Sequence, residues 1–197
     1  MSTSIRKPLA DALKTAEEFQ SLFDGCYERW EIAGSIRRRR SEIGDVEHCV
    51  IPLYNHSIKA VESNLLWLRL SELINEEGSL FATGQPLKWH IYPNGTMRRG
   101  SKYRGVEFQD MLHEIFILDE SNWGSQLVIR TGPADFSREM VIRLKYRDGK
   151  PTLYQHSEGY VTEQRTGNYV HVPTEERFFE LCGMRYVAPE RRDGFFK

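Results

Sequence analysis

Residues 34–47 read GSIRRRRSEIGDVE, and the prediction of the fold starts from this stretch. It begins with the pair Gly34-Ser35, continues into a run of arginines, and ends with Asp45 and Glu47 at the start of an apolar run. Glycine lets the backbone approach a ligand closely, and backbone amides, hydroxyls and guanidinium groups bind anions. Side chains two apart on a strand share a face, so the two carboxylates project together and favour a divalent cation. The stretch therefore predicts an anion site followed by a metal site.

The composition is that of an ordinary globular protein. The 197 residues suffice for one good core, or for one domain with a small appendage. No apolar run approaches the roughly 20 residues needed to cross a bilayer, and the N-terminus lacks the apolar stretch of a signal peptide. The three cysteines form no CxxC pair and fit no disulfide framework. We therefore expect a cytoplasmic protein without a membrane partner.

The charge is balanced overall but not locally. The net charge is -1, from 27 basic and 28 acidic residues, whereas autonomous DNA-binding domains are often strongly basic. Basic residues cluster at 37–40 and at 98–104. The second cluster predicts either a basic hairpin that contacts nucleic acid or a solvated turn. This charge distribution is compatible with a nucleic-acid substrate, but we do not expect the chain to bind nucleic acid tightly by itself.

Hydrophobic periodicity and turn residues predict alternating helices and strands. This alternation indicates an α/β (α+β) domain with a mixed β-sheet and flanking helices. A break near residues 148–151 divides it into a domain over 1–148 and a small subdomain over 149–197. Expected helices cover 8–23, 57–77, 136–143 and a segment capped by Thr174; expected strands cover 30–33, 46–53, 87–92, 103–108 and 114–118, with a turn at 93–95.

The motif Gly34-Ser35-x-Arg37-Arg38 followed by Gly44-Asp45-x-Glu47 resembles the signature of the polymerase-beta-type nucleotidyltransferase superfamily, and specifically of family X DNA polymerases. Residues 130–140 resemble the family's T-G segment, which lines the sugar and base of the nucleotide. Residues 174–192 resemble its closing element. The resemblance implies a nucleotidyltransferase palm over 1–148 and a thumb-like element over 149–197. With no N-terminal lyase domain or helix-hairpin-helix motif evident, the chain resembles the compact forms carried by some viruses and phages.

The resemblance also implies a set of site residues. It requires a third carboxylate on a neighbouring strand, for which Glu114 is favoured and Asp110 is the alternative. Asp45, Glu47 and Glu114 would then hold two Mg²⁺ ions, with Mn²⁺ as a substitute. The implied nucleotide-binding residues are Gly34, Ser35, Arg38 and Gly44 at the phosphates, and Thr131, Gly132, Asp135 and Ser137 at the nucleoside.

The activity implied is transfer of nucleotides from a (deoxy)nucleoside triphosphate to a 3′-hydroxyl, as in a minimal gap-filling DNA repair polymerase. Its partners would be the triphosphate and a nucleic-acid primer and template, and we expect a monomer. Glu47 and Glu114 replace the aspartates that the family has at these places. Two alternatives stay open: untemplated transfer to RNA, a small molecule or a protein, and a degenerate palm that binds nucleotide without catalysis.

Overall fold

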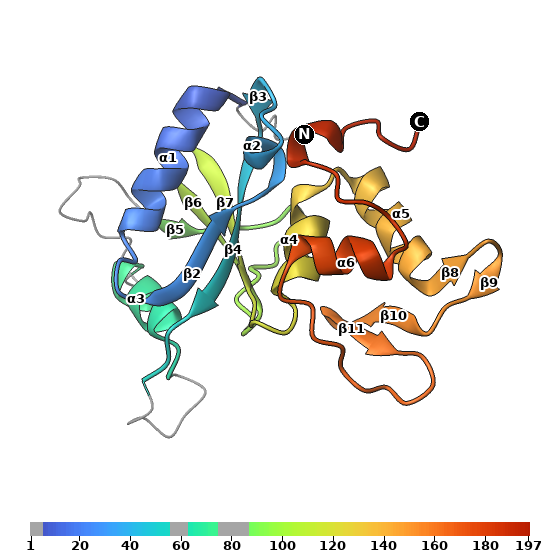
Figure 1. Ribbon diagram of the computed structural model, residues 1–197. Coiled ribbons are helices and arrows are strands. Elements are labelled where there is room, and N and C mark those ends of the chain that lie inside the picture. Colours follow the sequence, from blue (N-terminus) through green and yellow to red (C-terminus); the bar gives the residue numbers. More distant parts are fainter. Residues whose placement is uncertain (1–5, 56–62, 75–86) are drawn as a thin grey trace. The chain divides into compact units, whose positions relative to one another are not determined.

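The computed structural model describes residues 6–55, 63–74 and 87–197 (Figure 1). In these residues helices combine with a five-stranded mixed sheet, so the predicted α+β class is confirmed. The chain divides into two compact units. Unit 1 comprises Met1–Ile32 and Arg40–Ile117, and unit 2 comprises Ala33–Arg39 and Leu118–Lys197.

The sheet of unit 1 has the strand order β2-β4-β7-β6-β5. Strand β7 is central and runs parallel to β4, whereas the other neighbouring strands are antiparallel. A parallel pair needs a long crossover connection, and the described part of the segment between β4 and β7 accordingly contains a helix and two further strands. The strands are β2 (Tyr27–Ile32), β4 (Asp45–Pro52), β5 (Lys88–Trp89), β6 (Tyr103–Phe108) and β7 (Met111–Ile117); a separate pair joins β1 (Lys7–Pro8) to β3 (Glu42–Ile43).

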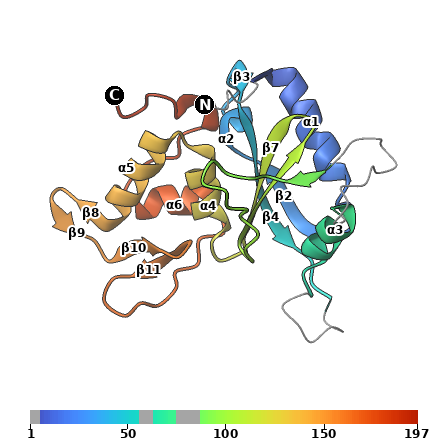
Figure 2. The ribbon, with the colours of Figure 1, turned by 180° about the vertical axis from the view of Figure 1, so that it is seen from behind.

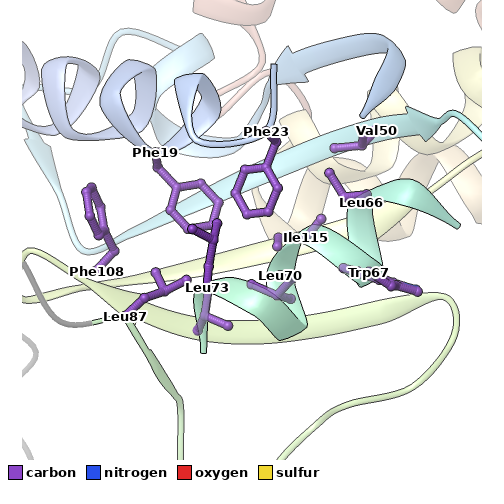
Figure 3. Close-up of a cluster of buried hydrophobic side chains, with 11 residues drawn as sticks. Phe19, Phe23, Val50, Leu66, Trp67, Leu70, Leu73, Leu87, Phe108 and Ile115 are labelled. Atoms are coloured by element: carbon purple, nitrogen blue, oxygen red, sulfur yellow. The ribbon is translucent and has the colours of Figure 1, made fainter. Parts of the chain in front are cut away.

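Helices α1 (Leu9–Ser21) and α3 (Leu65–Leu73) cover one face of this sheet (Figure 1). Figure 3 shows Phe19 and Phe23 directed toward the side chains of α3 and the sheet. Burying one such side chain stabilises the fold by about 1.5–3 kcal/mol. The fully buried members of this core are Phe19, Phe23, Val50, Leu66, Leu70, Leu87, Val106 and Ile115.

Unit 2 is mainly helical, with two small hairpins (Figure 2). Its core gathers apolar side chains from the helices and from the hairpin strand β11, including Phe136, Val161, Phe178 and Phe179. Its helices are α2 (Gly34–Arg37), α4 (Trp123–Thr131), α5 (Ala134–Lys145), α6 (Glu175–Leu181) and the 3-10 helix η2 (Pro189–Arg191); its hairpins pair β8 (Tyr146–Arg147) with β9 (Lys150–Pro151) and β10 (Tyr154–Ser157) with β11 (Tyr160–Glu163).

The predicted helices are confirmed where the structure describes them. The helix expected at 8–23 is α1, the one at 136–143 is α5, and Thr174 caps α6 by accepting a hydrogen bond from the Arg177 amide at 3.2 Å. The helix expected at 57–77 is α3, which begins only at Leu65 after the cap Asn64. Residues 57–62 and 75–77 of that prediction lie outside the described residues.

The strand predicted at 103–108 is confirmed as β6, whereas the other predicted strands differ in their bounds from the observed ones. The strand expected at 87–92 is only Lys88–Trp89, and the chain turns at 93–95 as predicted. The strand expected at 114–118 begins earlier, at Met111, because it forms a tight hairpin with β6. Helix α4 and the hairpin β10–β11 were not predicted.

The predicted division at 148/149 falls in the turn between β8 and β9, within unit 2. Its assignment to a palm and a thumb-like element stays a prediction. Over residues 6–55, 63–74 and 87–197, no helix combines the length and the apolar character that a membrane span requires.

Candidate functional site

Asp45 and Glu47 lie at the beginning of β4. Asp45 is exposed and Glu47 is half-buried, whereas Val46 and His48 between and after them are fully buried. The alternation shows that the two carboxylates share the face of the sheet opposite to α1 and α3. Their predicted common orientation is therefore present in the structure.

Glu114 lies directly beside Glu47. In the parallel pair of β4 and β7, Glu47 is the partner of Glu114, and Asp45 is the partner of Leu112. Neighbouring strands are about 4.8 Å apart and paired residues project from the same face, so all three carboxylates belong to one face. Asp110, the alternative third carboxylate, instead occupies the exposed turn between β6 and β7 with a φ of 60°.

Two tyrosines hold the Glu114 carboxylate. The Tyr92 hydroxyl donates to Glu114 Oε1 at 3.2 Å, and the Tyr103 hydroxyl donates to the same oxygen. The two hydroxyls also contact each other, and Tyr92 fits here because Gly105 has no Cβ, which would lie 2.8 Å from its hydroxyl. Burial, and then the hydrogen bond to Glu114, raise the pKa of Tyr103, so its hydroxyl stays protonated and can donate. One carboxylate oxygen is thus fixed from the β6 side.

The donor chemistry fits Mg²⁺, which prefers carboxylate oxygens. Three carboxylates from adjacent strands, on one face of the sheet, are a suitable set. However, the side chains of the described residues do not form a ready group of three or more His, Cys, Asp or Glu ligands. The hydrogen bonds to Tyr92 and Tyr103 hold the Glu114 carboxylate toward β6. The other two carboxylates are on β4, which lies on the opposite side of β7.

Behind the carboxylates, on the core face, lies a buried histidine pair. The Trp30 indole donates to His48 Nδ1 at 3.0 Å, and His48 Nε2 lies 3.0 Å from His113 Nδ1. Because Nδ1 of His48 accepts, its proton is on Nε2 and is donated to His113. Burial lowers the pKa of His48 to about 3, and burial followed by the charge of His48 lowers that of His113. Both imidazoles are neutral and serve the core.

In unit 2, Gly34 and Ser35 begin α2. Gly34 has a φ of 61°, a left-handed conformation that glycine adopts without the strain of a side chain. Helix α2 has only four residues, so its dipole is small and its N-terminus contributes little to the expected binding of an anion. In the described part of the chain, the buried Ser35 hydroxyl has no hydrogen-bond partner. Such a group is costly unless a ligand or water satisfies it.

Arg37 is tied into a buried ion-pair network. Its guanidinium donates two hydrogen bonds of 2.8 Å to the two oxygens of Glu175 and one of 3.0 Å to Thr131 Oγ1. Arg192, which is fully buried, forms an ion pair with Glu175 Oε1 at 2.9 Å. Burial alone would raise the pKa of Glu175, but the hydrogen bonds and charges of the two arginines outweigh it and lower the pKa. The Arg37 side chain therefore stabilises the structure of unit 2.

Arg38, the predicted phosphate ligand, also has protein partners. It donates to the Thr131 carbonyl at 2.6 Å and forms an ion pair with Asp193 at 3.3 Å. The structure thus brings the Gly34–Arg38 motif and the T-G segment together, although they are far apart in sequence. Binding of phosphate by Arg38 would have to replace or share the contact with Asp193.

The residues predicted to line the nucleoside make mainly local contacts. Thr131 is buried at the end of α4, and the Ser137 hydroxyl donates to the Ile129 carbonyl at 2.7 Å. A Cβ at Gly132 would lie 2.7 Å from Ser137 Oγ, so glycine allows this close packing. Asp135 accepts from the Phe136 amide at 2.9 Å in the first turn of α5. Gly44 belongs to unit 1, in the bend between β3 and β4.

The sequence alone does not indicate Tyr92, Tyr103 or the roles of Glu175 and Arg192. Tyr103, Gly105 and Glu107 alternate along β6, and the pairing of Gly105 with Glu114 brings Tyr103 near that carboxylate. Alternation is visible in the sequence, but the pairing of β6 with β7 in this register is not. Glu175 lies in the first turn of a helix, and no local pattern indicates its ion pair with Arg37, which is remote in sequence.

Comparison of the chain with models of known protein families finds no match. Comparison with curated proteins likewise finds no sequence that matches it significantly.

Proposed function

We propose that the chain is a nucleotidyltransferase that adds nucleotides from a nucleoside triphosphate to a 3′-hydroxyl, as a minimal gap-filling DNA polymerase of the family X type. One observation supports this most strongly: Asp45 and Glu47 share a face of β4, and Glu114 is the direct partner of Glu47 on the parallel strand β7. This is the arrangement that the resemblance requires of three metal-binding carboxylates.

Each carboxylate has a role as an oxygen ligand. Asp45, Glu47 and Glu114 would hold two Mg²⁺ ions, or Mn²⁺ in their place. Bound there, the metal would lower the pKa of the attacking 3′-hydroxyl and stabilise charge on the leaving pyrophosphate. The tyrosine hydroxyls bind only Oε1 of Glu114, which leaves Oε2 for ligation. Catalysis would otherwise rest on positioning.

The triphosphate is assigned to the turn at Gly34–Arg38. The buried Ser35 hydroxyl, without a partner among the described residues, would donate to a phosphate oxygen. Arg38 would add a charge-assisted hydrogen bond, while Arg37 keeps the turn in place through Glu175 and Thr131. The Gly44 amide would contribute a further donor, and Thr131, Gly132, Asp135 and Ser137 would line the nucleoside.

A second candidate is a palm that binds nucleotide without catalysis. It is favoured by the absence, among the described residues, of a ready group of three metal ligands, and by the replacement of two family aspartates with glutamates. Untemplated transfer to RNA, a small molecule or a protein is the alternative that the near-neutral net charge favours.

Primer extension on gapped DNA, with labelled deoxynucleotides and Mg²⁺ or Mn²⁺, tests the proposal. We expect extension that follows the template and is abolished by Asp45→Asn and by Glu114→Gln. Asp110→Asn is the matched control, because it removes an exposed carboxylate from a turn in which asparagine tolerates positive φ. Nucleotide binding without extension on DNA, RNA or small acceptors would instead support the non-catalytic palm.

A further inference from the structure

The loop before β6 and the beginning of β6 carry three arginines that lie over aromatic rings. Arg98 lies over Tyr92 and Tyr103, with its guanidinium carbon 4.6 Å and 5.5 Å from the ring centroids. Arg99 lies 5.4 Å from the ring of Trp89. Arg104 lies 4.0 Å from the ring of Trp67 and 5.8 Å from that of Trp89. Tyr103 and Arg104 are consecutive on β6 and project from opposite faces of the sheet, so these contacts continue around its edge at β6. We call the three arginines with Trp67, Trp89, Tyr92 and Tyr103 the arginine–aromatic surface.

Among the described residues, this surface has positive charge without an acidic partner. Within residues 6–55, 63–74 and 87–197, none of its three guanidinium groups has a carboxylate partner, although the neighbouring Lys88 and His90 both pair with Glu107. Burial, and then the charge of Arg99, lower the pKa of Arg104 to about 10, so it is still protonated at neutral pH. Cations held close together without a counter-ion gain from binding a polyanion.

The surface is ordered before any ligand binds. The Trp67 indole donates to the Ser101 carbonyl at 3.1 Å, and the Gly105 amide donates to the Arg98 carbonyl at 3.2 Å. The rings restrict the guanidinium groups, so less side-chain entropy is lost on binding a phosphate. Arg98 and Arg99 are nevertheless exposed and keep their hydrogen-bond donors accessible.

The Arg98 side of the surface adjoins the candidate metal site. Arg98 lies over Tyr103, and the Tyr103 hydroxyl donates to Glu114. A strand that follows the arginines would therefore have its end within about one side chain of the carboxylate face. A negatively charged strand with a reactive end fits this position better than an isolated anion does.

We propose that the arginine–aromatic surface binds the backbone of the nucleic-acid strand whose 3′-hydroxyl is extended. This inference rests on the proposed function and adds to it the surface that holds the acceptor. Arg98 and Arg99 contact phosphates, and Arg104 supports them from its position on Trp67. In a chain with a net charge of -1, affinity for the acceptor depends on this local cluster.

The test is fluorescence anisotropy with a labelled DNA hairpin that has a recessed 3′ end, titrated at several salt concentrations in EDTA. We expect Arg98→Gln/Arg99→Gln to weaken binding about tenfold and to reduce the slope of log K against log salt by about 2. Arg98→Lys/Arg99→Lys keeps both charges and should retain the slope. Lys14→Gln is the matched control, because it removes an exposed charge (77% exposed) from α1 of the same unit and should change nothing.

Binding equal to that of the native chain in the Arg→Gln double variant would overturn the inference, as would an equal loss in Lys14→Gln. No salt-dependent binding by the native chain, to the DNA hairpin or to its RNA equivalent, would overturn it as well. Tighter binding of the RNA hairpin, lost in the same variant, would support the surface and identify RNA as the acceptor. Because this assay contains neither metal nor nucleotide, its outcome is independent of primer extension, which tests the proposed function.

Discussion

Ser35 has a buried hydroxyl whose removal separates ligand binding from stability. Since the hydroxyl has no partner among the described residues, Ser35→Ala should leave the free energy of unfolding unchanged or slightly higher. Loss of a hydrogen bond to a charged phosphate should weaken nucleoside triphosphate binding by about tenfold to hundredfold. Calorimetric titration and urea unfolding measure the two effects.

Ser137→Ala is the comparison, because that hydroxyl donates to the Ile129 carbonyl at 2.7 Å. It should cost about 1 kcal/mol of stability. If Ser35→Ala destabilised the protein as much and left triphosphate affinity intact, the assignment of Ser35 to the phosphates would be wrong.

The Tyr103 hydroxyl fixes one oxygen of Glu114, and we expect it to be a positioning residue for the metal site. Removing a group that orients a ligand typically lowers metal affinity about 10- to 100-fold. Tyr103→Phe should therefore weaken Mn²⁺ binding to that extent, as measured from the electron paramagnetic resonance signal of free Mn²⁺. Tyr146→Phe removes the same atom from an exposed tyrosine in unit 2 and should bind Mn²⁺ normally. Equal affinity in the two variants would exclude the positioning role.

At the scale of elements, Glu175 connects α2, α6 and the segment around η2. Its side chain is almost fully buried and pairs with Arg37 and with the fully buried Arg192. Glu175→Ala leaves two buried guanidinium groups without their counter-charge, so we expect unfolding to become easier by about 3–5 kcal/mol. Urea denaturation followed by circular dichroism provides the measurement.

Glu180 on the same helix offers a matched control. It pairs with Arg177, but its side chain is 69% exposed, so water screens the ion pair. Glu180→Ala should change the stability by no more than about 1 kcal/mol. Similar losses in the two variants would show that the buried network is not the cause.

Local patterns predicted some elements well and failed at others for a physical reason. The apolar stripe of α1 and the apolar run of β4 are local, so the sequence indicated both. Helix α4 is buried almost all round, including Gly124, Ser125 and Gln126, so it has no polar face to reveal its period. The turn of the β10–β11 hairpin, Glu158-Gly159, has positive φ at both positions, as tight hairpin turns require, but glutamate is not a residue type that indicates such a turn.

In the candidate site, too, the sequence predicts local features but not those that depend on tertiary contacts. That Asp45 and Glu47 share a face follows from the period of a strand. That Glu114 lies beside Glu47 depends on a pairing between strands remote in sequence, and only the resemblance to a family suggested it. The tyrosines at Glu114 and the partners of Arg37 depend on tertiary contacts, which no local pattern specifies.

At the scale of the whole molecule, the buried histidine pair should make the protein sensitive to acid. In the unfolded chain both imidazoles have a pKa near 6.5, whereas the folded value for His48 is about 3 and that for His113 is also lowered. Below about pH 6.5 the unfolded state therefore binds more protons, and stability falls as the pH decreases toward 3. Above about pH 6.5 the histidine pair no longer contributes to the pH dependence of the free energy of unfolding.

Urea unfolding between pH 7.5 and pH 4 measures this dependence. His48→Gln should reduce its slope by up to about 1.4 kcal/mol per pH unit, the contribution of one proton. His171→Gln changes an exposed histidine and should leave the slope as it is in the native chain. A slope that is the same in all three proteins would contradict the assignment of the acid sensitivity to the pair.

The seven residues Ala33–Arg39 belong to unit 2, although the chain on both sides of them belongs to unit 1. During translation they leave the ribosome well before Glu175, the partner of Arg37, has been synthesised. Unit 2 therefore cannot be completed co-translationally in the order of the sequence, and must wait for its last helices. Expression of residues 118–197 as an isolated fragment would omit α2 and leave Glu175 and Arg192 without Arg37. No single cut in the chain separates the two units intact.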